Sequence, residues 1–171
     1  GKRIGTQRGS AVHFFLHLFL LKHNIPEGEV SLVFLKAEDL PPALEEGTID
    51  AFSMREPYVS EAKDRLGDRT IVFESPRIYY RAELLVATKT ITEGHPEAAK
   101  ALIRAMLRAA ELAEADPAQA VSIVAQNLGV PREHIARLWP RFRTDVRLGQ
   151  ALLTSMESQA AWAIQANLVK G

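Results

Sequence analysis

Short apolar segments alternate with helical segments over the first half of the chain, and this alternation restricts the possible folds more than any other feature. Strands are expected where Val, Ile, Leu and Phe gather, over residues 3–6, 30–35, 49–54, 70–74 and 84–88. Helices are expected over residues 10–23, 39–46 and 56–66. Strands that are joined through a helix usually pair in parallel. The sequence therefore predicts an α/β fold, with a mainly parallel sheet flanked by helices.

The composition changes near Thr88, after which Ala-, Leu- and Arg-rich segments dominate. Four helices are expected there, over residues 95–115, 117–128, 131–139 and 150–169. Residues 142–148 fit either a strand or an extended loop. The change near Thr88 marks a candidate boundary between two regions, although no flexible linker accompanies it.

The balance of charges and the absence of cysteine exclude several classes of protein. Lys and Arg number 21, and so do Asp and Glu, which gives a formal net charge of zero. Without a basic excess, a nucleic-acid partner is not expected. Because the chain has no Cys, disulfides, thiolate metal sites and a Cys nucleophile are excluded. The longest apolar run, residues 11–21, is shorter than the roughly 20 residues of a transmembrane helix, so membrane insertion is not expected.

The first expected strand leads into a turn bracketed by Gly5 and Gly9, and Ser10 stands where the following helix begins. A helix N-terminus offers unbonded amide N–H groups and the positive end of the helix dipole, which together favour an anion or a polar ligand head. The alternative is that Ser10 only caps the helix and that the turn binds water. The turn is therefore a candidate ligand site with a purely structural alternative.

Four stretches, the opening turn among them, share their order and spacing with a known group of proteins. They are Gly-Lys-Arg-Ile-Gly at 1–5 with Gly9 and Ser10, the pattern Ala-Leu-x-x-Gly-x-Ile-Asp-Ala at 43–51, Glu-Pro-Tyr at 56–58, and Leu-Val-Ala-Thr at 85–88 followed by His-Pro-Glu-Ala at 95–98. Together they resemble the periplasmic solute-binding proteins of ABC importers, in the group that binds sulfonates, nitrate, taurine and thiamine precursors.

The resemblance implies a fold of the type II periplasmic-binding-protein kind, in which two lobes close around a solute. Residues 1–84 would form the second lobe, and residues 85–171 would supply the returning strand and the helices of the first lobe. Part of the first lobe is then expected to lie outside this chain. If a second copy supplies it, a homodimer or a swapped dimer is expected.

The first group of candidate ligand contacts lies in the opening turn. It consists of the side chains of Thr6, Gln7 and Ser10 with the backbone N–H groups of Ala11 and Val12. In the resembling proteins this turn faces the ligand, and here it could hold a sulfonate, a phosphate, a carboxylate or a polar ring edge.

The second group follows the third expected strand, at the end of the sheet where open parallel sheets bind ligands. It consists of Arg55, Glu56 and Tyr58. The resembling proteins often carry an aromatic residue where this chain has Arg55, so a stacking surface is replaced by a cation that can pair with an anion. The alternatives are an ion pair of Arg55 with Glu56 or Asp50, and a Glu56 that only stabilises the first helical turn. Asp50 itself is expected to hold local backbone.

No motif in the sequence indicates an enzyme. The chain lacks a GxSxG elbow, a P-loop and a GxGxxG fingerprint, so no catalytic residue and no cofactor are expected. His13 and His17 have a spacing that can bind a metal, but a third ligand is not evident and they are expected to be ordinary helix residues. Tyr79 and Tyr80 fit either a stacking surface in a cleft or a packed pair.

We therefore expect the substrate-binding component of an ABC-type importer, or its C-terminal portion, for a small anionic or heterocyclic solute such as a sulfonate, nitrate or a thiamine precursor. The expected partners are that solute and an ABC permease. The expected location is periplasmic or otherwise extracytoplasmic, as a lipid-anchored or soluble protein. The alternatives are a ligand-sensing domain of a signalling receptor and a domain-swapped module for protein assembly.

Overall fold

The computed structural model describes residues 1–76, 78–79 and 82–170 and separates the chain into two units. Gly1–Ala82 and Gln150–Gly171 make up the first, here called the sheet unit. Glu83–Gly149 make up the second, here called the helical unit. The two lobes expected from the sequence divide the chain differently, because they group residues 150–171 with residues 85–149. That the two regions are lobes of a binding protein stays a prediction.

Three parallel strands form the centre of the sheet unit in the order β2-β1-β3, which confirms the predicted parallel sheet. They are β1 (Arg3–Thr6), β2 (Ser31–Phe34) and β3 (Ala51–Phe52). Gly5 of the central strand lies opposite Val33 on one side and Phe52 on the other. Strands β2 and β3 are shorter than predicted, although the amides of Leu35, Asp50 and Ser53 next to their ends still bond carbonyls of β1.

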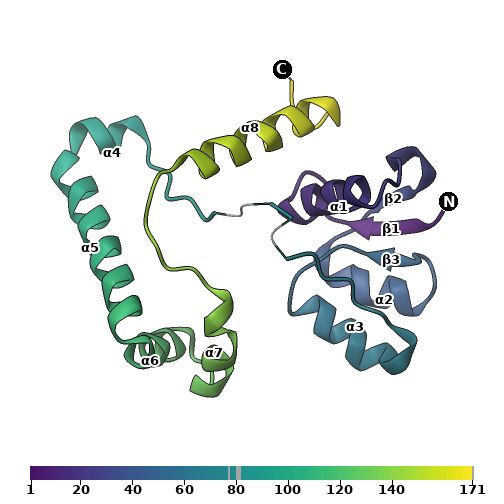
Figure 1. Ribbon diagram of the computed structural model, residues 1–171, viewed down its shortest axis with the longest axis horizontal. Coiled ribbons are helices and arrows are strands. Elements are labelled where there is room, and N and C mark those ends of the chain that lie inside the picture. The colour runs from purple at the N-terminus through teal and green to yellow at the C-terminus, as the bar shows by residue number, and fades with distance from the viewer. Residues whose placement is uncertain (77, 80–81, 171) are drawn as a thin grey trace. The chain divides into compact units, whose positions relative to one another are not determined.

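Helices cover both faces of this sheet (Figure 1). They are α1 (Ala11–Lys22) on one face and α2 (Leu40–Glu45) with α3 (Tyr58–Leu66) on the other, with single 3-10 turns η1 (Glu27–Glu29), η2 (Ala37–Asp39) and η3 (Gly67–Arg69) between elements. Leu40, Ala43 and Ile49 form the core beneath α2. A Cβ on Gly5 would lie 2.6 Å from a methyl of Leu40 and 2.8 Å from one of Ile49. The glycine of the central strand therefore lets the core approach the backbone.

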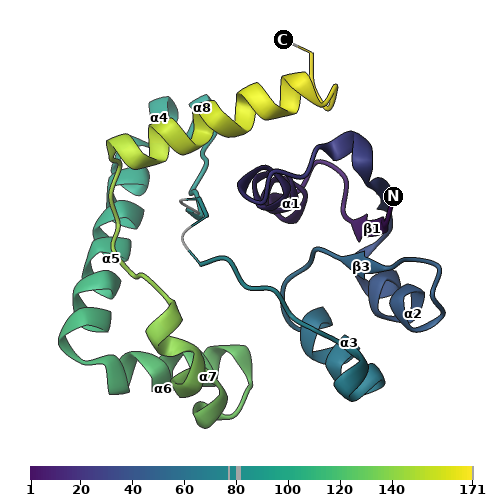
Figure 2. The same cartoon turned by 45° about the vertical axis from the view of Figure 1, so that its right-hand side comes forward.

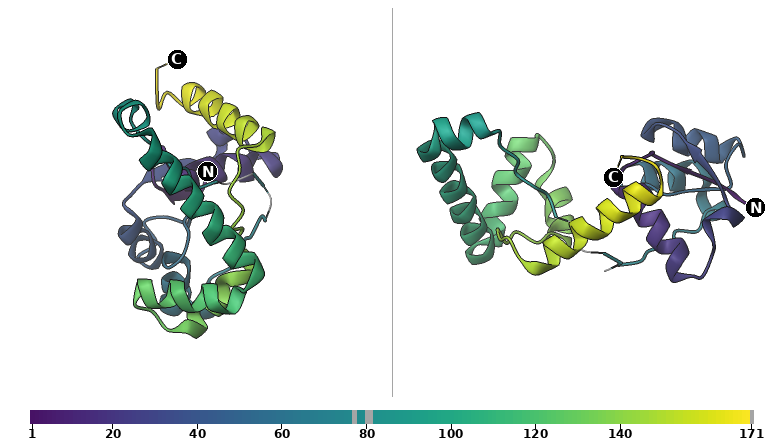
Figure 3. Two further views of the ribbon diagram at one scale, coloured as in Figure 1. Left: turned by 90° about the vertical axis from the view of Figure 1, so that its left-hand side faces the viewer. Right: turned by 90° about the horizontal axis from the view of Figure 1, so that it is seen from above.

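Helix α8 (Gln150–Gln165) belongs to the sheet unit, where its C-terminal part lies beside α1 (Figure 3). It ends four residues before the predicted end at 169, because Asn167 takes the left-handed conformation with φ of 53°. The Leu168 amide then bonds the Ala163 carbonyl at 2.9 Å, the pattern of a Schellman C-cap. The buried ring of Trp162 contacts His13 and Phe14 of α1.

The described residues of the helical unit form helices joined by short loops, without a strand (Figure 2). They are α4 (Lys89–Gly94), α5 (Pro96–Ala115), α6 (Pro117–Leu128) and α7 (Arg132–Leu138), followed by the 3-10 turn η4 (Trp139–Arg141). Its core is formed by Val121, Ala125 and Ile135, where α6 packs against α7. Helix α6 has the predicted bounds, whereas α4 was not predicted because its two threonines and Gly94 are weak helix formers.

Two predicted strands are wrong. Residues 70–74 and 84–88 have no regular secondary structure, so the returning strand expected at the start of the second region is not formed. Ile71 is 78% exposed and Val86 is 84% exposed. A strand needs the backbone groups of a neighbour, and in the pairings of the described residues neither segment is joined to β1, β2 or β3. Residues 142–148, for which a strand and an extended loop were both open, form an extended loop.

Of the helices in the described residues, none combines the length and the apolar character that crossing a membrane requires.

Candidate functional site

The turn between β1 and α1 is closed by hydrogen bonds among its own residues. Ser10 is the N-cap of α1, and its Oγ accepts a hydrogen bond from the His13 amide at 3.3 Å. The same hydroxyl donates to the Gln7 carbonyl at 2.7 Å. Gly9 takes a left-handed conformation with φ of 67°, which glycine adopts without steric cost. Ser10 thus caps the helix as the structural alternative requires, and its proton is already in use.

The amides of Ala11 and Val12 remain available at the start of α1. Among the described residues no acceptor is bonded to either amide. Their carbonyls are occupied, because Tyr79 Oη donates to Ala11 at 3.5 Å and Ser53 Oγ donates to Val12 at 2.8 Å. Tyr80, predicted together with Tyr79, lies outside the described residues. Two N–H donors at the positive end of a helix can bind an oxyanion.

Thr6 and Gln7 are placed differently from each other. Thr6 is fully buried, and its hydroxyl donates to the Ser53 carbonyl at 3.4 Å. Gln7 is half-buried and contributes its carbonyl to Ser10. Whether either side chain touches a ligand stays a prediction.

Ser53 is a residue of this region that the sequence did not single out. It is buried at the end of β3, where its amide donates to the Gly5 carbonyl at 2.9 Å and its hydroxyl to the carbonyl of Val12. It thereby joins the carboxyl edge of the sheet to the first turn of α1. A single Ser after a short apolar strand carries no signal that would have revealed this role.

The second predicted group stays close to the surface. Arg55 and Glu56 are exposed, and Tyr58 is half-buried at the first position of α3. Glu56 accepts a hydrogen bond from the Ser60 amide at 3.0 Å, which is the first-turn role given as its alternative. No ion pair in the described part of the chain includes Arg55, so neither of its predicted ion pairs is formed. No hydrogen bond joins these residues to the β1–α1 turn within the described ranges.

Asp50 holds local backbone, as expected from the sequence. Its carboxylate accepts from the Arg3 amide at 2.7 Å and from the Arg3 guanidinium at 3.1 Å. These hydrogen bonds stabilise the charged form and lower the pKa of Asp50 to about 2. The pair fastens the start of β1 to the segment that leads into β3.

His13 lies behind the turn and is 4% exposed. Its Nδ1 accepts a hydrogen bond from the Gly9 amide at 3.2 Å. Its ring meets those of Phe34 and Trp162 edge to face, with centroid separations of 5.1 Å and 4.9 Å. Burial lowers the pKa of His13 below its ordinary value. His17, its neighbour on α1, is bonded through Nδ1 to Glu27 at 2.8 Å.

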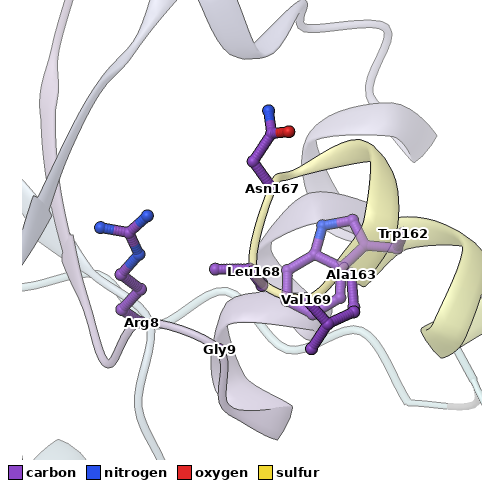
Figure 4. A pocket seen from close by; sticks show the side chains of 7 residues that line it. All are labelled: Arg8, Gly9, Trp162, Ala163, Asn167, Leu168 and Val169. Carbon is purple, nitrogen blue, oxygen red and sulfur yellow. The ribbon is translucent and has the colours of Figure 1, made fainter. Parts of the chain in front are cut away.

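A cavity of about 380 Å³ opens beside the turn (Figure 4). Its lining comes from the turn and from the end of α8 with the residues that follow: Arg8, Gly9, Trp162, Ala163, Asn167, Leu168 and Val169. The Arg8 guanidinium lies 5.4 Å from the centre of the Phe34 ring. Sequence reasoning missed Trp162 and Asn167, because only the packing of α8 on α1 brings them here. The cavity combines a cation, an indole and an amide.

The known proteins with similar sequences carry names that describe binding proteins. The model of the NMT1-like family matches residues 1–129. A protein of Escherichia coli (strain K12), assigned as an aliphatic sulfonates-binding protein, is 22% identical over 94% of this chain and 50% of its own length. A protein of Bacillus subtilis (strain 168) with the same assignment is 30% identical over 57% of this chain and 29% of its own length.

Solved structures show the same fold. The periplasmic aliphatic sulphonate binding protein SsuA from Escherichia coli matches with a TM-score of 0.71 and 17% identity, over 100% of this chain and 56% of its own. The alkanesulfonate-binding protein SsuA from Xanthomonas axonopodis pv. citri, bound to MOPS, matches with a TM-score of 0.60 and 21% identity, over 97% and 57%. The predicted α/β fold of periplasmic binding proteins is therefore confirmed. The chain spans about half the length of these proteins, or less.

Proposed function

The chain belongs to the NMT1-like family, and from that premise we propose that it is the solute-binding component of an ABC-type importer, or a C-terminal portion of that component. The proposed solute is a small organic sulfonate. Nitrate and thiamine precursors, the other solutes that the sequence suggested, serve as competitors in the test. The proposed partner is the permease of the importer, and the proposed location is periplasmic or otherwise extracytoplasmic.

The observation that carries the proposal is the pair of amides at Ala11 and Val12, to which no acceptor is bonded in the described part of the chain. A sulfonate has three oxygens that share one negative charge, so it can accept hydrogen bonds from both amides at once. The positive end of the α1 dipole favours the same charge. The relatives assigned to aliphatic sulfonates support this class of ligand.

The cavity beside the turn supports an organic sulfonate over a bare inorganic anion. It adjoins Gly9, and the buried indole of Trp162 forms part of its wall. Arg8 and Asn167 lie at the same cavity and could bond a polar substituent. We propose that the carbon chain of the solute occupies this cavity while its sulfonate meets the two amides.

The proposed role is binding without chemical conversion. The names of the relatives describe binding proteins. At the turn, the hydroxyl of Ser10 is engaged with Gln7, and the imidazole of His13 is engaged with Gly9. These groups hold the turn in shape, which is what a binding site requires.

Isothermal titration calorimetry of the full-length protein tests the proposal, with ethanesulfonate, butanesulfonate, nitrate and a thiamine-precursor pyrimidine. We expect the two sulfonates to bind more tightly than the other two compounds. If none of the four binds to the folded protein, the proposal is wrong.

A proline at position 11 tests the amide directly. Proline fits the first position of a helix and only removes the N–H, and Ser10 before it already has the extended conformation that precedes proline (φ −102°, ψ 170°). Ala11→Pro should weaken sulfonate binding about tenfold, since a hydrogen bond to a charged group contributes about 1.5 kcal/mol or more. Lys89→Pro, at the first position of α4 after the extended Thr88, is the matched control and should bind normally.

A further inference from the structure

We propose that His13 is a positioning residue for the sulfonate site: its Nδ1 holds the Gly9 amide and its ring edge holds Trp162, so that protonation of the ring weakens sulfonate binding. This inference rests on the proposed function. It adds a residue that need not touch the solute and a pH dependence that the solute itself cannot supply, because a sulfonate stays ionised far below neutral pH.

The hydrogen bond from Gly9 fixes the protonation of the ring. An imidazole nitrogen can accept an N–H only through its lone pair, so Nδ1 must be unprotonated and the ring proton must lie on Nε2. A second proton on Nδ1 would replace this attraction with a clash between two N–H groups. The left-handed Gly9 precedes the capping Ser10 directly. A displaced Gly9 would therefore shift the two amides that follow it.

The ring of His13 also contacts a second residue of the cavity lining, Trp162. Gly9 and Trp162 both line the cavity, and His13 contacts both of them. The ring meets the indole at 4.9 Å with an interplanar angle of 81°. One buried side chain thus fixes the turn that would bind the sulfonate and the indole that would contact its carbon chain.

The surroundings of the ring keep it neutral at neutral pH. Burial is the largest effect and lowers the pKa of His13 below 6.5. Of the charged groups that act on it, Glu27 raises the pKa, whereas His17 and Arg8 lower it. The contacts from β2 and α8 come from the uncharged rings of Phe34 and Trp162. The site is thus intact above pH 6.5 and loses its support as the pH falls through the lowered pKa.

Two substitutions separate positioning from simple packing. His13→Asn retains an acceptor near the position of Nδ1 but cannot titrate, whereas His13→Phe retains a ring beside Trp162 but has no acceptor. In the full-length protein, butanesulfonate should bind more weakly as the pH falls from 8 through the lowered pKa of His13. The loss should reach about tenfold once the ring is protonated, which is the net contribution of about one hydrogen bond. For His13→Asn the affinity should be nearly independent of pH, and for His13→Phe it should be low throughout this range. His134→Asn, on the exposed surface of α7 in the helical unit, is the control and should keep the wild-type pH dependence.

An NMR titration without any solute tests the same coupling. The Gly9 amide resonance should shift together with the His13 imidazole, with a midpoint below 6.5, and should not shift in His13→Asn. A Gly9 resonance that ignores the titration, or a His13→Asn protein that keeps the pH-dependent affinity, would overturn the inference. If no sulfonate binds at any pH, the proposed function fails, and the NMR titration alone decides whether His13 holds the turn.

Discussion

The sheet unit and the helical unit stabilise their elements in different ways. In the sheet unit, polar side chains reach between elements that are distant in sequence, as Ser53 does to Val12 and Arg3 does to Asp50. In the helical unit, most of the described side-chain hydrogen bonds stay within one helix, and the bond from Arg132 of α7 to Ser122 of α6 crosses between helices. The sheet unit therefore has a geometry fixed by specific polar contacts, whereas the helical unit depends on the apolar contact between α6 and α7.

Helix α5 of the helical unit leaves most of its apolar face exposed. It has 20 residues and a clear apolar stripe, yet Ala113 is its one buried residue among those described. Leu102, Ile103 and Leu107 are 48%, 50% and 41% exposed. A helical pattern in the sequence thus predicts the helix and its apolar face but not the surface that the face would meet.

The largest expected effect tests the core of the sheet unit. Ile49, 1% exposed, belongs to the cluster with Leu40, and Ile49→Ala should cost about 2–5 kcal/mol of unfolding free energy because it leaves a cavity. The two Trp residues give each unit its own fluorescence signal. With Trp139→Phe, Trp162 reports on the sheet unit during denaturation by urea. Ile123→Ala on α6, where the side chain is 42% exposed, is the control. In a Trp162→Phe background, where Trp139 reports on the helical unit, it should cost much less. Equal losses would mean that Ile49 is not packed in the core as described.

Overfilling the same core should cost less. Gly5→Ala would place a methyl group 2.6 Å from Leu40 and 2.8 Å from Ile49, both deeply buried, and so should cost about 1–3 kcal/mol. Gly28→Ala, with no atom within 4 Å of the added methyl, is the matched control. Denaturation followed through Trp162 measures both. A stable Gly5→Ala protein would show that the core can relax around the central strand.

The helix caps give a comparison at smaller scale. Ser10 caps α1 and Asp116 caps α6, each by accepting an amide hydrogen bond, at 3.3 Å and 2.9 Å. Replacing either by Ala should cost about 0.5–2 kcal/mol. The loss from Ser10→Ala should appear in the Trp162 signal and that from Asp116→Ala in the Trp139 signal. If each substitution changed both signals equally, the two units would unfold together.

Much of the fold follows from local sequence, and the two strands that were predicted wrongly share one physical cause. The strand at β1 and the helix over 117–128 were predicted because their patterns are complete within a few residues. The segments at 70–74 and 84–88 have equally good strand patterns but no partner strand, and pattern alone does not show whether a partner is present.

The features of the candidate site also differ in whether local sequence could predict them. The Ser10 cap and the free amides behind it follow from the order strand, glycine turn and helix, so they could be predicted. Thr6 was predicted as a ligand contact from its position near the turn, and this stays a prediction. Its side chain is buried at the end of β1, in a sheet that helices cover on both faces. Ser53 and Trp162 reach the site through packing between distant elements, which no local pattern records.

The smallest expected effect is a loss of stability at low pH, which comes from the Arg3–Asp50 pair of the sheet unit. Because the folded pKa of Asp50 is about 2 and its ordinary value is 3.8, the unfolded chain takes up the proton first as the pH falls. The stability from the Arg3–Asp50 pair is thus fully present above about pH 4 and is lost between pH 4 and pH 2. Urea unfolding followed through Trp162 should show a steeper loss over this range in the wild type than in Asp50→Asn. The difference should be small because the pair is exposed to solvent. The Trp139 signal should be the same in both proteins, since the contact lies wholly within the sheet unit.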